Sequence, residues 1–241
     1  MRRAALLTFA LALVAAGCGG VESVETTAPV TTAPPVTTTS GDPGRDAIEA
    51  FAAAARANDA AALWSMLSTS AQQRLGPAPA AFRFGAARGL TASVGAFGTY
   101  RVIVSERVTP EFGVVAIDGT QVVGGKLEES VYAVALRLEG TAWKIELGGP
   151  VKIRPLGPDP GARKQVVTQI ADAVERPAGA GTAVTYLDGK ALSPRVTGPS
   201  SSSRMVADVG AGLDPGRHTV VAFAATDRDA SATAWAFTVA K

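Results

Sequence analysis

Four side chains suited to acid–base chemistry fall in strand-like segments of the first half of the chain: Tyr100, Glu106, Asp118 and Tyr132. A buried carboxylate that faces a tyrosine hydroxyl can move a proton next to a carbonyl, so such residues could line an isomerase-type cavity. Asp118 precedes Gly119, a pair typical of a turn, and Tyr132 shares the apolar face of its segment, which is typical of packing. Tyr100, Asp118 and Tyr132 are therefore candidate cavity residues, and we predict that none of them is catalytic.

Metal chemistry is limited by the supply of ligands, because the chain holds one cysteine, Cys18, and one histidine, His218. A single cysteine excludes a disulfide framework and a zinc site built from cysteines. The aspartates nearest to His218 in the sequence are Asp208, Asp214, Asp227 and Asp229. Asp208, Asp214 and Asp227 are weak partners for His218 in a metal site, and Asp227 with Asp229 lacks the closely grouped oxygens that calcium needs. We predict that His218 is a structural residue bonded to its own turn, and that the chain binds no metal and no cofactor.

Cys18 closes a segment with the layout of a bacterial export signal. The basic start Met1–Arg3 precedes the apolar run Ala4–Ala16, which is shorter than the roughly 20 residues needed to span a bilayer. Residues 14–18, Val-Ala-Ala-Gly-Cys, resemble a bacterial lipoprotein signal, which implies removal of residues 1–17 and lipidation of Cys18. The alternative is an ordinary signal peptide cut nearby, leaving a free cysteine. Lipidation would anchor the mature protein outside the cytoplasm, on the outer face of the cell membrane.

Residues 18–44 are expected to form a disordered tether that starts at the lipidated cysteine. The stretch from Gly19 to Gly44 holds seven Thr and four Pro and no aromatic residue. Such a stretch cannot bury enough apolar surface to offset its ordering entropy, and its prolines favour locally extended backbone. The tether would therefore hold the folded part of the chain away from the membrane.

Residues 45–154 are predicted to be helical first and β-stranded afterwards. Asp42-Pro43 supplies a helix cap, after which Ile48, Phe51 and Ala55 recur at helical spacing. Further helices are expected at 63–67, 70–75 and 77–87, then strands at 100–108, 114–117, 127–138 and 143–147, with turns at Asp118-Gly119 and Gly140-Thr141. This order indicates an α+β domain, with helices packed on one face of a curved antiparallel sheet.

Short motifs in this region resemble a known fold. They are Ile48-Glu-Ala-Phe-Ala, Leu63-Trp-Ser-Met-Leu and the closing strand Trp143-Lys-Ile. Together they resemble the nuclear-transport-factor-2-like (NTF2-like) fold. That group includes isomerases, dehydratases and many modules without a known reaction, so the resemblance implies no particular activity.

Residues 155–162 are predicted to be a linker, because prolines and glycines crowd them, and residues 163–241 an all-β sandwich. Strand-like runs fall at 166–174, 183–187, 204–209, 219–225 and 234–239. Short strands at this spacing indicate a sandwich, although the first run could also be helical. Trp235 and Phe237 are two positions apart and are expected to face the opposing sheet.

The turns and strands of this second region carry four motifs. They are Tyr186-Leu-Asp-Gly, Gly212-Leu-Asp-Pro-Gly-Arg-His-Thr-Val, Ala224-Ala-Thr-Asp and Trp235-Ala-Phe-Thr-Val. These motifs resemble the immunoglobulin-like modules of bacterial surface proteins. The resemblance implies an immunoglobulin-like sandwich in which the proline–glycine turn and the histidine, here His218, are structural.

The charge balance bears on the partners of the protein. The chain has 23 Lys and Arg against 21 Asp and Glu, and Arg2 and Arg3 lie in the expected signal peptide. A mature chain without net charge argues against nucleic-acid binding. The arginine- and alanine-rich composition is typical of high-GC Gram-positive bacteria, the actinobacteria.

Two functions from different classes follow from these patterns. We predict a non-enzymatic cell-surface lipoprotein that displays a pair of binding modules to an envelope protein, a glycan or a small molecule. The alternative is small-molecule binding or isomerase-like activity in the cavity of the first domain. Convergent buried carboxylates with perturbed pKa values in that cavity would favour the alternative.

Overall fold

The computed structural model describes residues 42–76, 94–147, 149, 151–157, 169–175, 182–198, 203–209 and 213–240. The chain divides into two units, of which Thr38–Lys241 is compact and Met1–Thr37 lies outside the described residues. The predicted signal peptide, Cys18, most of the predicted tether and the predicted helix at 77–87 also fall outside them. Within the described ranges, no helix is both long and apolar enough to cross a membrane.

Three helices begin the described chain, and a polar side chain caps the start of each. The helices are α1 (Pro43–Arg56), α2 (Ala60–Met66) and α3 (Thr69–Leu75). Asp42, Asp59 and Ser68 accept hydrogen bonds from backbone N–H groups in the first turns of α1, α2 and α3, at 2.9–3.1 Å. Such caps satisfy N–H groups that a helix leaves unpaired. The cap and first-turn proline predicted at Asp42-Pro43 are confirmed.

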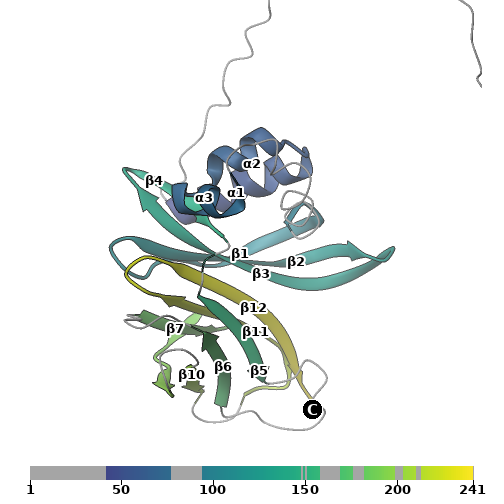
Figure 1. Ribbon diagram of the computed structural model, residues 1–241. Coiled ribbons are helices and arrows are strands. Elements are labelled where there is room, and N and C mark those ends of the chain that lie inside the picture. The colour runs from purple at the N-terminus through teal and green to yellow at the C-terminus, as the bar shows by residue number, and fades with distance from the viewer. Residues whose placement is uncertain are drawn as a thin grey trace, which may run out of the picture. The chain divides into compact units, whose positions relative to one another are not determined.

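In the described residues, antiparallel strands form three sheets of four strands each (Figure 1). Sheet A has the order β1-β2-β3-β4 and consists of β1 (Phe97–Arg107), β2 (Phe112–Val123), β3 (Lys126–Glu139) and β4 (Ala142–Glu146). Sheet B has the order β5-β6-β10-β9 and consists of β5 (Lys152–Gly157), β6 (Gln169–Glu175), β9 (Arg195–Thr197) and β10 (Ser203–Asp208). Sheet C has the order β12-β11-β7-β8 and consists of β7 (Thr182–Leu187), β8 (Lys190–Leu192), β11 (Gly216–Ala225) and β12 (Ala230–Val239). Sheets B and C pack face to face as a β-sandwich.

The α+β class predicted for residues 45–154 is wrong, because the described structure is mostly antiparallel β-sheet. Its helices have only 14, 7 and 7 residues, and α2 and α3 each bury a single residue, Leu63 and Ala71. The strands dominate the region instead, because β1, β2 and β3 have 11, 12 and 14 residues, and the strand predicted at 114–117 is only part of β2. An alanine-rich stretch predicts helix because alanine is the strongest helix former, but it says nothing about the length of the strands that follow.

Sheet C is buried on both faces. Phe223 of β11 faces sheet A and packs with Val114, whereas its neighbour Ala222 faces sheet B and packs with Met205. The core shared by sheets A and C consists of Val104, Phe112, Val114, Ala116, Ala133, Ala135, Tyr186, Val221, Phe223, Ala225 and Ala230. A strand covered on both sides becomes a continuous apolar run, which explains the uninterrupted run from Val220 to Ala225.

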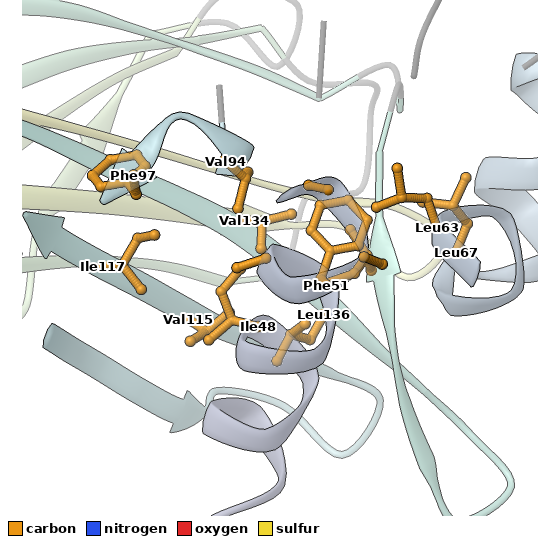
Figure 2. Packing of buried hydrophobic residues seen from close by; sticks show 14 of the residues in the cluster. Ile48, Phe51, Leu63, Leu67, Val94, Phe97, Val115, Ile117, Val134 and Leu136 are labelled. Atoms are coloured by element: carbon orange, nitrogen blue, oxygen red, sulfur yellow. The ribbon is translucent and has the colours of Figure 1, made fainter. Parts of the chain in front are cut away.

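The opposite face of sheet A carries α1, as Figure 2 shows. Ile48 and Phe51 of α1 are fully buried in one cluster with Val115 and Leu136 of the sheet. Successive residues of a strand point to opposite faces, so Val115 faces the helices and Val114 faces sheet C. The same alternation decides which face of sheet A each candidate site residue occupies.

Asp118-Gly119 is not a turn, contrary to the sequence prediction. Both residues lie inside β2, and the chain reverses at Gly124-Gly125, where φ is +58° and +81°. Positive φ at both central residues is a hairpin geometry that glycine adopts without strain. Gly119 serves a different purpose, because a Cβ atom there would collide with the carbonyl oxygen of Thr99 on β1.

The structure bears on three other predictions from the sequence. The hairpin predicted at Gly140-Thr141 is confirmed, because β3 and β4 pair across it. β5 covers residues 152–157 and so overlaps the start of the predicted linker, whose residues 158–162 lie outside the described ranges. Phe237 is buried, and Trp235 is partly buried beside Met205 on the face of sheet C that is turned to sheet B.

Candidate functional site

Asp118 of β2 lies where sheets A and C meet, and it binds two arginines. Its Oδ2 accepts a hydrogen bond from Arg101 Nη2 of β1 at 3.1 Å, and its Oδ1 accepts one from Arg217 Nη2 of β11 at 2.8 Å. Arg217 Nε also pairs with Glu129 Oε2 of β3 at 2.9 Å. The Asp118 carboxylate is buried, and an unpaired charge there would be costly, so the two guanidinium groups stabilise it.

A hollow of about 430 Å³ adjoins this cluster and is lined by Arg101, Val102, Ile103, Asp188, Arg217 and Thr219. The pairing of β1 with β2 shifts register between Val102 and Val104, and such bulges redirect side chains. The Arg101 side chain is 75% exposed, so solvent reaches its guanidinium beside the Asp118 contact. The hollow is therefore lined by charged side chains of both signs, of which both arginines are already paired with carboxylates.

Asp188 and His218 bind each other beside this hollow. His218 Nδ1 lies 2.7 Å from Asp188 Oδ2, and His218 Nε2 lies 2.8 Å from the carbonyl oxygen of Asp214. The second Asp188 oxygen accepts a hydrogen bond from the backbone N–H of Thr219 at 2.8 Å. Both ring nitrogens face acceptors, so only the doubly protonated imidazolium can donate to both. His218 thus ties the 213–216 turn to the Asp188 turn.

The pKa of His218 reflects two opposing effects. Burial by itself would lower the pKa, but the hydrogen bonds and negative charge of Asp188 and the Asp214 carbonyl raise it above the ordinary value of 6.5. A histidine whose pKa is raised by folding stabilises the fold fully below its unfolded pKa, and that stabilisation is lost as pH rises through the folded pKa.

We therefore expect the wild-type protein to lose free energy of unfolding between about pH 5.5 and about pH 8.5, and His218→Ala to lose less over the same range. Urea melts of both proteins at the two pH values measure the difference. Asp188→Asn is the matched control, because it keeps a side-chain acceptor but removes the charge that favours the imidazolium. A His218→Ala protein with the same pH dependence as the wild type would contradict this role.

The structure does not bring the candidate cavity residues together. Tyr100 and Tyr132 pack with the cluster on the helix side of sheet A, whereas Asp118 points to the opposite face, toward sheet C. Burial raises the pKa of Tyr132 to about 12, which disfavours proton release. Tyr100 packs edge to face on Phe97 at 6.4 Å, below the Arg56 guanidinium. A carboxylate–tyrosine pair of the predicted kind is not formed by these residues.

Glu146 is a second buried carboxylate, and its environment could not be predicted from local sequence. It alternates along β4 with Trp143 and Ile145, which pack in the cluster on the helix side of sheet A. Its side chain is 0% exposed and accepts hydrogen bonds from Ser68 Oγ at 2.8 Å, Arg137 Nε at 2.6 Å and Arg74 Nη2. The one available signal was the hairpin at 140–141, whose register places Arg137 diagonally across from Glu146.

The Glu146 cluster also reaches the sandwich. Arg74 Nη1 binds Asp229 Oδ1 at 2.9 Å, and Arg137 Nη2 donates to the carbonyl oxygen of Arg228. Asp229 and Arg228 belong to the connection between β11 and β12. A groove of about 470 Å³ lies alongside, lined by residues of β3, β4, β5 and β12 that include Glu146 and Lys152.

Metal ligands do not gather in the described part of the chain, where no three residues among His, Cys, Asp and Glu form a group able to hold an ion. No protein-family model and no curated protein matches the chain. The candidate site is therefore interpreted from its geometry alone.

Proposed function

We propose that the chain is a non-enzymatic cell-surface lipoprotein that carries a folded binding body on a tether. The proposal rests on the signal-like residues 1–17, on Cys18 directly after them and on the Thr- and Pro-rich residues 18–44. Its partner would be an envelope protein, a glycan or a small molecule. The charge balance of the chain argues against nucleic acid.

The proposal that the protein is not an enzyme rests on the hydrogen bonds and ion pairs of the buried ionisable groups in the described residues. Asp118, Glu146 and His218 are each engaged with partners on other strands or turns. General acid–base catalysis needs a group that can reach a substrate proton. Here these groups instead join sheet A, the helices and the sandwich to one another, which supports a structural role for them.

The same contacts support display of the folded part as one body. Sheets A and C share an apolar core, and the pairs Asp118–Arg217 and Asp229–Arg74 add charged contacts at two places. A rigid body on a flexible tether keeps the geometry of its binding surface while it samples partners. The resemblance of residues 163–241 to bacterial immunoglobulin-like modules is part of this proposal and rests on the sequence motifs alone.

Replacing Cys18 with alanine tests the anchor. Without the thiol no lipid can be attached, and a mature chain without its acyl groups has no stable hold on the bilayer. We expect Cys18→Ala either to leave the membrane fraction for the medium or to accumulate as an unprocessed precursor. Immunoblots of membrane, soluble and medium fractions, with the mass of the mature protein, measure this outcome.

Ser23→Ala is the matched control, because it changes a small polar residue just beyond the cleavage region and should leave anchoring unchanged. Amine-reactive crosslinking of the same intact cells tests the binding part, and adducts should be lost when the anchor is lost. Processing and membrane retention of Cys18→Ala equal to those of the wild type would refute the lipoprotein proposal.

A further inference from the structure

The free end of the β2–β3 hairpin exposes an apolar surface. Val122 is 60% exposed, Val123 44% and Leu127 70%, and these residues surround the Gly124-Gly125 turn. Burial in β2 decreases steadily toward this end, and no described atom lies within 4 Å of a Cβ placed on either glycine. Figure 1 shows β2 and β3 running together to that end. We call Val122, Val123 and Leu127 the tip cluster.

Clustered exposed apolar side chains of this kind mark a contact surface. Apart from Leu156, the large hydrophobic residues that are exposed in the described chain all belong to the tip cluster. The residues pair across the hairpin, Val122 with Leu127 and Val123 with Lys126, so both faces of the ribbon end are partly apolar. A hairpin end that is apolar on both faces is better suited to insertion into a lipid phase than to docking on a flat protein surface.

The charges near the tip nearly cancel. Lys126 and Glu128 are exposed and of opposite sign, and Glu129 is already paired with Arg217. This surface therefore does not attract anionic lipids or a polyanion electrostatically. The contact it offers is apolar, and its strength should depend little on salt or on lipid charge.

The predicted tether has the length to bring the tip to the bilayer. Residues 19–41 separate Cys18 from Asp42, and a Pro-rich segment of about 23 residues reaches up to about 70 Å at about 3.1 Å per residue. Asp42 accepts a hydrogen bond from Ser105, which pairs with Val115 on β2, and about eight residues of strand from Val115 to Val123 cover about 27 Å. The reach of the tether exceeds that length, so the anchor and the tip can contact the same membrane, where the second contact is effectively intramolecular.

We infer that the tip cluster inserts into the interface of the bilayer that holds the lipid anchor. This inference rests on the proposed lipoprotein function, and it adds that the body rests on the membrane through the β2–β3 hairpin. A second copy of the chain fits the surface less well, because a stable interface buries about 1,200–2,000 Å² in total and the tip cluster is only three side chains. A lipid interface accepts a few apolar side chains when another anchor is already in place.

The test uses the mature lipidated protein reconstituted in phosphatidylcholine vesicles, with and without phosphatidylglycerol. Lipidation consumes the only native cysteine, so Leu127→Cys creates a single thiol for the polarity-sensitive fluorophore NBD. Leu156→Cys, on an exposed apolar residue of β5, is the matched control. We expect the emission of the label at 127 to shift to the blue and to be quenched by lipids spin-labelled near the headgroup, in both lipid mixtures and at high salt. The label at 156 should do neither.

The outcomes separate the inference from the function on which it rests. A protein that fails to float with the vesicles and whose Cys18 reacts with maleimide refutes the lipoprotein proposal, and the inference with it. A protein that floats, with the label at 127 as solvated as the label at 156, refutes the inference alone. A blue shift that grows with protein density and is not quenched by the labelled lipids assigns the tip to self-association and overturns membrane insertion.

Discussion

Glu146→Ala should lower the free energy of unfolding by about 3–5 kcal/mol, the range measured when one partner of a buried ion pair is removed. The Glu146 side chain is 0% exposed, and its loss leaves Arg74 and Arg137 without their shared carboxylate in a partly buried place. It also removes an acceptor for the Ser68 hydroxyl, which caps α3. The edge of sheet A, the third helix and the contact with Asp229 should weaken together. Urea melts at neutral pH measure the change in midpoint and slope.

The matched control is Glu49→Ala on α1. Glu49 forms an exposed pair with Arg45 one helical turn away, and such pairs contribute about 0.3–0.5 kcal/mol. The two variants remove the same side chain, so the difference between them isolates the effect of burial and of the arginine pair. If Glu146→Ala were no more destabilising than Glu49→Ala, the cluster would not be a stabilising connection.

Phe223→Ala is the second substitution with a large expected effect. The ring is fully buried in the core shared by sheets A and C, and truncating a buried phenylalanine typically costs about 3–5 kcal/mol. Because that core draws on both predicted regions, we expect the sandwich and the helix-bearing sheet to unfold in one cooperative transition, in the variant and in the wild type.

Fluorine-labelled tryptophan can follow both parts at once. Trp64 and Trp143 lie in the first region and Trp235 in the second, and their unfolding curves should coincide. Leu156→Ala is the control, since that side chain is 45% exposed and its loss should shift the midpoint little. Separate transitions for Trp235 and the other two residues would show that the two regions unfold independently and that the shared core contributes little.

Local signals in the sequence were sufficient for elements whose ends are fixed by nearby residues. The cap at Asp42 and the hairpin at Gly140-Thr141 are examples, because each depends on side chains and turns within a few positions. The fold class was not predictable in the same way. The short strand predicted at 114–117 is part of the 12-residue β2, which pairs along its length with β1 and β3 and packs on sheet C from the second half of the chain. How far a strand extends depends on such partners, which local propensity does not identify.

The environments of Asp118 and Glu146 were not predictable for a related reason. Asp118-Gly119 carries a turn signal, but Asp118 lies inside β2, where it binds Arg101 of β1 and the sequence-distant Arg217 of sheet C. No residue near Asp118 in the sequence indicates that Arg217 is its partner. For Glu146, strand alternation indicates only that it lies on the opposite face of β4 from Trp143 and Ile145. Whether that second face meets water or another sheet depends on the packing of the sandwich.

Sheet C has apolar residues on both faces, and this bears on how the gene can change. A gene segment that encoded only the sandwich would produce a sheet with Val221, Phe223 and Ala225 turned to water, a surface that promotes aggregation. Recombination that moved this sandwich to another protein would therefore have to replace those side chains as well. The run from Val220 to Ala225 thus makes the second half of the chain depend on the first for burial.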